Sequence, residues 1–229
     1  AGAMEPLVAL LRSTEKVSAL RNEAWCLSNL CRINPTPPAW ESVAPAIPVL
    51  AHVLSTSEDA DVLTDACWAF SYMLDAGNDR IQALVDAGTC PRLAELLAHN
   101  SSNVVSPALR AVGNIITGDD AQTQAVLDAG VLPRFAALVT HTKREIRKET
   151  CWAMSNVLAG TQAQVQQVID AGLLPAVLTL AESPDHDIRR EAHYAIHNLV
   201  DSGSGDQVGV LVALGGARPL VAACTGQPA

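Results

Sequence analysis

The chain has 229 residues, of which 24 are acidic and 15 are lysine or arginine, so the formal net charge is −9. A hydrophobic content of 49% with 17% charged residues excludes a disordered chain. The negative charge argues against a nucleic-acid-binding surface, and no run reaches the roughly 18 apolar residues of a membrane span. We therefore expect a soluble, intracellular protein with neither a nucleic acid nor a membrane as a direct partner.

The beginning of the chain and its cysteines carry no functional signal. Residues 1–4 are interpreted as an expression-tag remnant. The six cysteines form no CxxC pair. Cys67 and Cys151 each precede a tryptophan in apolar, helical surroundings, and we expect buried free thiols in a reducing compartment.

Three sequence markers recur with a period of about 42 residues. A bulky residue recurs first after 43 residues and then three more times at intervals of 42 residues. An Asp-Ala-Gly motif occurs at 86–88, 128–130 and 170–172. A proline follows each motif and occurs once more after a step of 44. The positions of the first and third markers are Trp25, Trp68, Arg110, Trp152 and Tyr194, and Pro91, Pro133, Pro175 and Pro219.

Each period predicts three helices in the same order. The first, such as 80–87, ends at a glycine that suits the left-handed conformation. The second begins near the proline and carries an apolar stripe such as Leu93, Leu96 and Leu97. The third, such as 146–158, carries the bulky marker. Three helices in about 42 residues are typical of an armadillo or HEAT array, in which stacking completes the core.

We therefore predict an all-α, right-handed superhelical solenoid of armadillo repeats that forms one domain over residues 5–229. It begins with a partial repeat at about 5–34 and ends with a partial repeat at 204–229. Between these we expect four full repeats, at about 35–76, 77–118, 119–160 and 161–203.

The predicted third helices carry a ladder of paired side chains. In four of five, an aromatic residue is followed four positions later by Asn or Tyr, which places both on one helix face. On another face, apolar residues recur as core candidates. For a single pair, ordinary core packing is an alternative, but a repeated polar residue favours an exposed face along a concave groove. The pairs are Trp25/Asn29, Trp68/Tyr72, Trp152/Asn156 and Tyr194/Asn198, with Arg110/Asn114 as the exception, and the core candidates are Leu27, Phe70, Val112, Met154 and Ile196.

The residue types of the ladder suit an extended Lys/Arg-rich peptide. Asparagine offers a donor and an acceptor to a peptide backbone. Exposed aromatic rings attract cations by about 0.5–1 kcal/mol each. Asp65, Glu149 and Glu191 precede the aromatic position by three residues and lie on its face, although each alone is more typical of a solvated helix surface. Arg110 would repel a lysine and divides the ladder into two stretches.

These motifs resemble the importin-α family of nuclear import adaptors, in particular its fourth to ninth repeats. The strings at 108–118 and 152–156 carry the resemblance together with the order of the ladder residues. It implies a residual major peptide site and a minor site, with this chain holding mainly the minor one. The major-site residues are Trp25, Asn29, Asp61, Asp65, Trp68 and Tyr72, and the minor-site residues are Arg110, Asn114, Thr117, Glu149, Trp152, Ser155, Asn156, Glu191, Tyr194 and Asn198.

The resemblance also implies partners and a location. We expect nuclear localisation signals of cargo proteins as ligands, importin-β bound through a segment missing here, and the export receptor and nucleoporins as further partners. The protein is expected to shuttle between cytoplasm and nucleus. Tyr194 stands where the family usually has tryptophan, which puts the outermost slot in doubt. His193 and His197 flank it and would make binding pH-sensitive, but they lack a third ligand for a metal.

Two other classes of protein remain as alternatives. Another armadillo or HEAT scaffold, catenin-like or vacuolar, would share the fold but typically lacks a regular Trp/Asn ladder. An enzyme is not expected, since no glycine-rich phosphate loop, GxSxG or HExxH motif is present. We expect no cofactor and no metal.

Overall fold

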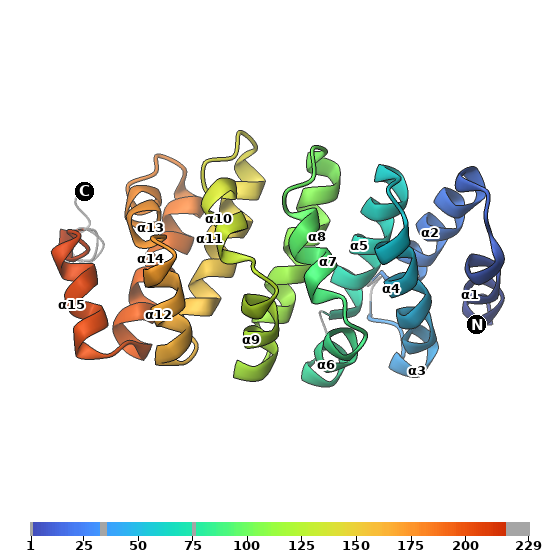
Figure 1. The fold of residues 1–229 in the computed structure, drawn as a ribbon, viewed down its shortest axis with the longest axis horizontal. Helices are drawn as coiled ribbons and strands as arrows, with labels where there is room; N and C mark the ends of the chain where they lie inside the picture. The colour runs from blue at the N-terminus through green and yellow to red at the C-terminus, as the bar shows by residue number, and fades with distance from the viewer. Residues whose placement is uncertain (1, 33–35, 75–76, 219–229) are drawn as a thin grey trace. The chain divides into compact units, whose positions relative to one another are not determined.

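The computed structural model describes residues 2–32, 36–74 and 77–218. The first tag residue, the predicted repeat boundaries at 34–35 and 76, the proline at 219 and the cysteine at 224 lie outside these ranges. Every regular element in them is helical, which confirms the all-α prediction (Figure 1). No helix in these ranges has the length and apolar character that crossing a bilayer requires.

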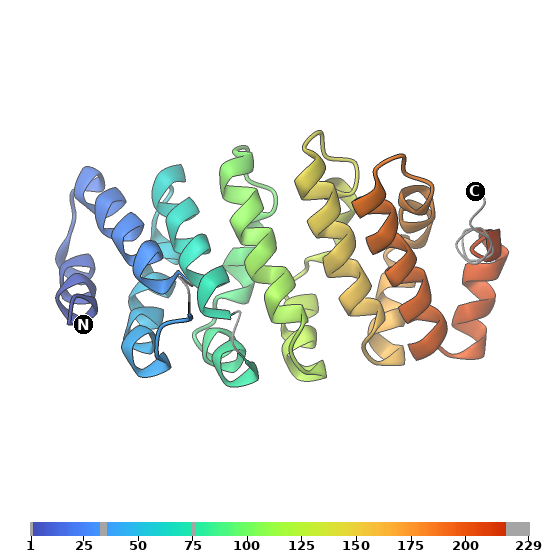
Figure 2. The same cartoon turned by 180° about the vertical axis from the view of Figure 1, so that it is seen from behind.

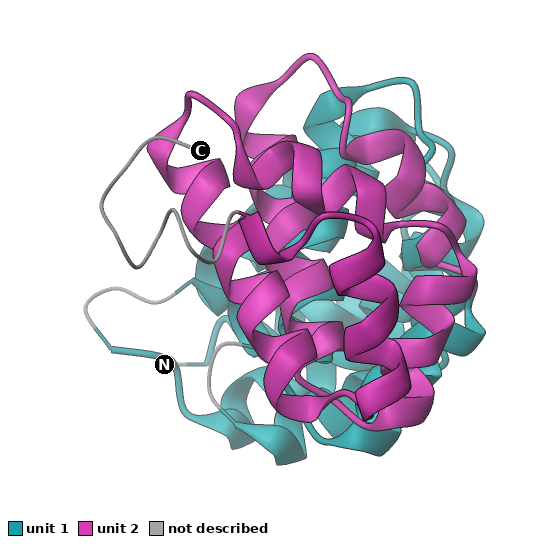
Figure 3. Ribbon diagram, turned by 90° about the vertical axis from the view of Figure 1, so that its left-hand side faces the viewer, with its two compact units in different colours: residues 1–129 teal, residues 130–229 magenta. Residues whose placement is uncertain are grey.

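The chain divides into two compact units, residues 1–129 and 130–229 (Figure 3). The helices of the first unit are α1 (Met4–Ser13), α2 (Val17–Cys31), α3 (Trp40–Val43), a 3-10 turn (Ala44–Ala46), α4 (Ile47–Thr56), α5 (Ala60–Leu74), α6 (Asn78–Asp86), α7 (Cys90–Leu96), α8 (Ser102–Ile116) and α9 (Asp120–Asp128). Those of the second are α10 (Leu132–Leu138), α11 (Arg144–Leu158), α12 (Gln162–Asp170), α13 (Leu174–Ala181), α14 (His186–Ser202) and α15 (Gly205–Ala213).

The long helices that carry the ladder lie side by side within each unit. In the first unit α5 packs between α2 and α8, and in the second α11 packs against α14 (Figure 2). The predicted helices 80–87 and 146–158 correspond to α6 and α11, and the predicted second-helix stripe is buried on and just after α7. The three-helix plan of the period is therefore confirmed in these segments.

Glycine ends the first helix of three periods. Gly88, Gly130 and Gly172 have φ values of +69°, +82° and +68°. This left-handed backbone conformation is accessible to glycine at little cost, which explains the Asp-Ala-Gly marker.

The predicted core face of the third helices is confirmed. Leu27, Phe70, Val112, Met154 and Ile196 expose at most 1% of their surface. These residues follow the ladder aromatics by two positions, so the ladder residues occupy a different side of each helix.

Four of the five cysteines in the described ranges are buried free thiols, as predicted. Burial raises the pKa of Cys31 and of Cys151 to about 12 and keeps these thiols protonated. Cys26 is exposed, so the prediction was wrong for this residue: it directly follows Trp25 on the outer side of α2.

Candidate functional site

The ladder aromatics reach the surface of both units, in contrast to the core residues two positions later. Trp25 on α2 is 59% exposed and Tyr194 on α14 is 53% exposed. Trp68 on α5 and Trp152 on α11 are half-buried. The third helices therefore present aromatic rings to solvent at one repeated position.

Trp68 and Tyr72 form an aromatic stack on α5. Their ring centroids are 5.6 Å apart and their planes are inclined by 18°. Because Tyr72 stands where the other third helices carry asparagine, this position offers a broad aromatic wall and a phenol in place of an amide.

Two ladder asparagines connect neighbouring third helices. Asn114 Nδ2 on α8 donates to the Ser71 carbonyl oxygen on α5 at 3.0 Å. Asn198 Nδ2 on α14 donates to the Ser155 carbonyl oxygen on α11 at 2.8 Å. One N–H group of each amide is thereby used inside its own unit, while its Oδ1 accepts no hydrogen bond from the described residues. The amide nitrogen carries a second N–H group, so donation to a peptide by these two asparagines stays a prediction.

The other two asparagines differ from this pair. Asn29 Nδ2 donates to the Trp25 carbonyl oxygen of its own helix at 2.8 Å and is exposed. Asn156 Nδ2 is buried and has no hydrogen-bond partner in the described part of the chain. A buried amide nitrogen without an acceptor costs free energy, and Asn156 lacks the hydrogen bond that orients each of the other three amides.

A buried serine supports each tryptophan of the ladder. The Oγ atoms of Ser28, Ser71 and Ser155 donate to the carbonyl oxygens of Trp25, Trp68 and Trp152 at 2.8–2.9 Å. Ser155 is only 3% exposed, so its side chain lies beneath the face and its carbonyl oxygen holds Asn198. Ser155, which was predicted as a peptide contact, lies beneath the ladder residues and bonds to the backbone that carries them.

The acids that precede the aromatic position differ between the units. On α11 and α14, Glu149 and Glu191 are each 8% exposed. Asp65 on α5 is half-buried and accepts a long hydrogen bond of 3.4 Å from Ser28 Oγ. Burial raises the pKa of Asp65, the Ser28 hydroxyl opposes this rise, and the charge of Asp61 adds to it.

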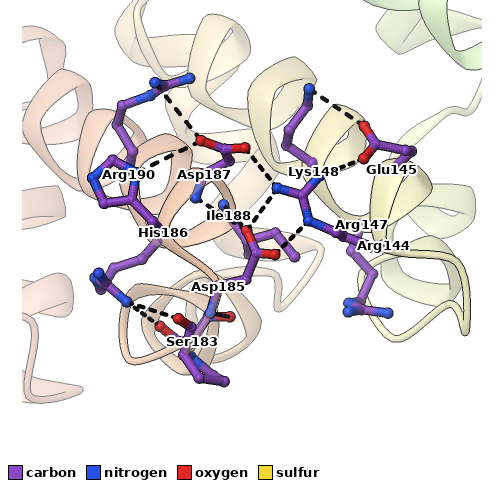
Figure 4. Close-up of polar contacts among 12 residues, drawn as sticks. Arg144, Glu145, Arg147, Lys148, Ser183, Asp185, His186, Asp187, Ile188 and Arg190 are labelled. Atoms are coloured by element: carbon purple, nitrogen blue, oxygen red, sulfur yellow. Dashed lines mark hydrogen bonds and ion pairs between the residues drawn. The ribbon is translucent and has the colours of Figure 1, made fainter.

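An ion-pair network joins the beginnings of α11 and α14 (Figure 4). Arg144 NH2 lies 2.6 Å from Asp187 Oδ2 and 3.2 Å from Asp185 Oδ1. Asp185 also caps α14, because its Oδ1 accepts from the backbone N–H groups of Asp187 and Ile188. Arg144 and these backbone donors lower the pKa of Asp185 to about 2.

The first unit contains a similar network. Arg21 on α2 pairs with Asp59 at 2.6 Å and with Asp61 at 3.4 Å. Asp59 Oδ1 accepts from the backbone N–H groups of Asp61 and Val62 at the start of α5. These capping aspartates were missed from sequence, although an aspartate just before an apolar helix is a recognisable signal.

A glutamine ladder on the first helices was also missed. Capping boxes join Asp119 to Gln122, Thr161 to Gln164 and Ser204 to Gln207. In addition, Gln122 Nε2 donates to the Asn78 carbonyl oxygen at 3.1 Å, and Gln207 Nε2 to that of Gln162 at 2.8 Å. The spacing of Asp, Thr or Ser from Gln three residues later is the sequence signature that identifies such boxes.

Trp40, the one tryptophan of the sequence outside the ladder position, has a specific partner. The guanidinium carbon of Arg80 lies 5.1 Å from the centre of the Trp40 ring, a cation–π contact between α3 and α6. Trp40 is not on the ladder face.

The predicted minor-site residues are distributed over both units. Arg110 and Asn114 on α8, and Thr117 at its end, belong to the first unit, where Thr117 Oγ1 donates to the Asn114 carbonyl oxygen at 2.7 Å. The other minor-site residues lie on α11 and α14 in the second unit. Beside Tyr194, His193 is half-buried and His197 is exposed. Among the residues that the structure describes, no group of three potential ligands is arranged for a metal ion.

The model of the armadillo/beta-catenin-like repeat matches five segments of the chain, which are residues 1–32, 38–75, 77–117, 119–159 and 161–201. Importin subunit alpha-1a of Oryza sativa subsp. japonica is 55% identical over 116 residues, which are 51% of this chain and 22% of that protein. Importin subunit alpha-B of Dictyostelium discoideum is 48% identical over 114 residues, 49% of this chain and 22% of that protein. The predicted resemblance to importin-α is confirmed by these relatives, of whose length the chain spans about a fifth.

Solved structures share the fold over nearly the whole chain. A designed armadillo repeat protein in complex with the peptide (KR)4 superposes with a TM-score of 0.86 at 27% identity, covering 96% of this chain and 90% of that one. Together with the five matched repeats, this likeness shows that the chain belongs to the armadillo/beta-catenin-like repeat family.

Proposed function

We propose that the protein is a nuclear import adaptor that binds extended Lys/Arg-rich localisation signals along the ladder of its third helices. The observation that carries this proposal is the orientation of the ladder amides. Because Asn114 and Asn198 donate Nδ2 to a neighbouring helix, each keeps an oxygen acceptor for a backbone N–H group of a bound peptide. Such recognition is independent of the peptide's side chains, which suits a protein that binds many different localisation signals.

The neighbouring side chains supply the preference for basic residues. Aromatic walls at Trp152 and Tyr194 accommodate aliphatic stems and attract cations, and Glu149 and Glu191 lie on the same helices. Similarity to proteins named importin subunit alpha supports the import role, and the designed relative solved with (KR)4 supports binding of a basic peptide.

In this proposal the peptide contacts are those predicted from sequence, with two stretches. One comprises Trp25, Asn29, Asp61, Asp65, Trp68 and Tyr72. The other comprises Arg110, Asn114, Thr117, Glu149, Trp152, Asn156, Glu191, Tyr194 and Asn198, with Ser155 as their support. Importin-β, an export receptor and nucleoporins are proposed as partners of the whole protein, which would shuttle between cytoplasm and nucleus as an adaptor without enzymatic activity.

Calorimetry with a Lys/Arg-rich peptide tests the site. The double variant Trp152→Ala, Asn156→Ala removes an aromatic wall and the amide whose nitrogen lacks a partner, and we expect at least about ten-fold weaker binding. The control is Trp40→Ala, which removes a tryptophan that lies off the ladder. Thermal unfolding verifies that each variant is folded. Equal affinity of the wild type and the double variant would refute the assignment.

A further inference from the structure

Both ladder aromatics of the second unit are preceded by a basic residue and then a glutamate. Lys148 and Glu149 precede Trp152 by four and three positions, and Arg190 and Glu191 precede Tyr194 in the same way. Residues three and four apart share a helix face. We call each ladder aromatic together with the acid three residues before it a slot. Each slot of the second unit therefore contains a cation of the protein itself beside the acid that would receive a cation of the cargo.

These cations form ion pairs with the glutamates that follow them. Arg190 NH2 lies 3.0 Å from Glu191 Oε1, within hydrogen-bond distance, and Lys148 Nζ lies 3.6 Å from Glu149 Oε1. The pKa of Arg190 is raised chiefly by its hydrogen bond to Glu191 and by the charge of Glu191, and the charges of Asp187 and Tyr194 add to this rise. A cargo side chain thus meets carboxylates that are neutralised in the free protein.

Each internal cation also has a second acid one helical turn earlier. Lys148 Nζ lies 3.4 Å from Glu145 Oε2, and Arg190 NH1 lies 3.9 Å from Asp187 Oδ1 (Figure 4). The side chain of Arg190 is half exposed and that of Lys148 is a quarter exposed. Both second acids also pair with Arg144, so each internal cation contacts two carboxylates and keeps one of them when cargo displaces it from Glu149 or Glu191.

The Trp68 position in the first unit lacks such a cation. Thr64 stands four residues before Trp68, and its Oγ1 donates to the Ala60 carbonyl oxygen at 2.7 Å. Asp65 forms no ion pair with any residue in the described ranges, while Asp61, one helical turn earlier, pairs with Arg21 on α2 at 3.4 Å. This slot keeps an acid that is not neutralised by its own helix.

We propose that Arg190 and Lys148 are specificity-determining residues that compete with cargo cations for Glu191 and Glu149. The inference rests on the proposed function and deepens it. The second unit then binds a basic side chain only when the rest of the peptide is held well enough to displace the internal cation. The Trp68 slot accepts a lysine or arginine without this displacement, and single basic residues bind there in preference.

The variant Arg190→Gln tests the competition at the Tyr194 slot. With an octapeptide of alternating Lys and Arg in low-salt buffer, we expect about two- to five-fold tighter binding, the size of one partly exposed ion pair. Binding should also depend more steeply on salt concentration, since Glu191 is no longer neutralised. Arg190→Lys keeps the competitor and should retain the affinity of the wild type. Arg134→Gln on α10, an exposed residue off the ladder, is the control for the same change in net charge.

The converse variant introduces a competitor where none exists. Thr64→Arg places a guanidinium four residues before Trp68, and we expect about two- to five-fold weaker binding with a shallower salt dependence. Thr64→Gln controls for the loss of the Thr64 hydrogen bond and for side-chain size. Thermal unfolding of both variants verifies that they are folded.

The outcomes separate this inference from the proposed function. Binding of the octapeptide by the wild type together with an unchanged or weaker affinity of Arg190→Gln would overturn the competition and leave the peptide-binding function intact. Absence of binding by the wild type and by Arg190→Gln alike would refute the function and, with it, the competition.

Discussion

The side chain of Asn198 divides its hydrogen-bonding groups between the fold and the surface. Its Nδ2 holds the Ser155 carbonyl oxygen, and this bond fixes the orientation of the whole amide. An amide that is free to rotate must lose that freedom when a peptide binds, whereas Asn198 and Asn114 are oriented beforehand. Preorganisation of this kind improves affinity because it lowers the entropic cost of binding.

His193 provides a prediction about pH at the scale of one residue. Burial lowers its pKa, the charge of Arg189 adds to this, and a backbone hydrogen bond at Ala181 opposes it. Since the pKa of an unfolded histidine is about 6.5, the unfolded chain binds the proton more readily. We therefore expect the free energy of unfolding to fall as the pH drops through 6.5 toward the lower folded-state pKa.

Urea unfolding at pH 7.5 and pH 5.5 checks this prediction by comparison of variants. His193→Gln should lose less stability on acidification than the wild type. His197→Gln, an exposed residue on the same helix, should lose as much as the wild type. Parallel losses in all three proteins would show that His193 does not contribute.

At the scale of helices, the capping glutamines perform two tasks with one side chain. Gln122 Oε1 accepts from the Asp119 backbone N–H at 3.0 Å and closes the start of α9. Its Nε2 donates to Asn78 and to Gln82 on α6, the preceding first helix. Local helix formation and packing between periods are thus coupled, which favours cooperative folding of neighbouring repeats.

Gln122→Ala should therefore destabilise the first unit by about 2 kcal/mol, because it removes these bonds from a side chain that is only 2% exposed. Gln122→Glu keeps the acceptor but loses the donor and should cost more. A Cβ added at Gly118 would lie 1.9 Å from Gln122 Oε1, so Gly118→Ala should displace the carboxamide and reproduce the effect. Chemical unfolding monitored by circular dichroism measures all three. Wild-type stability of Gln122→Ala would contradict the coupling.

At the scale of the whole molecule, the net charge of −9 acts on any basic ligand before contact. The field of many separated charges accelerates association, and salt screens it within about 8–10 Å. Contacts already made in the slots are screened less, so the two kinetic constants should respond differently to salt.

We accordingly expect the association rate constant of a Lys/Arg-rich peptide to fall by about ten-fold between 50 mM and 500 mM salt, while the dissociation rate constant changes little. Stopped-flow fluorescence with a labelled peptide measures both. A peptide with glutamine at the basic positions is the control. A salt dependence that resides mainly in dissociation would show that steering by the net charge is unimportant.

The extent to which sequence predicted these features follows from the kind of interaction involved. The period, the helix ends at Gly88 and its equivalents, and the buried position of Phe70 depend on local conformation and helical periodicity, which the chain displays directly. The partner of Asn114 is a backbone oxygen 43 residues away, and the partner of Trp40 is Arg80, 40 residues away. Such pairings depend on the stacking of repeats, and only the structure reveals that one N–H group of the amide is already engaged.

The acceptors of the Asn114, Asn198, Gln122 and Gln207 bonds to preceding periods include main-chain oxygens. Every residue carries such an oxygen, so these four bonds require no particular side chain on the receiving repeat, whereas the Gln122–Gln82 and Arg144–Asp185 contacts need a matching side chain on both. Duplication of a repeat, or a change of exposed residues outside such side-chain pairs, therefore keeps the main-chain bonds without a compensating mutation in the neighbour. The scaffold can lengthen or alter its ligand preference one module at a time and keep the same junctions.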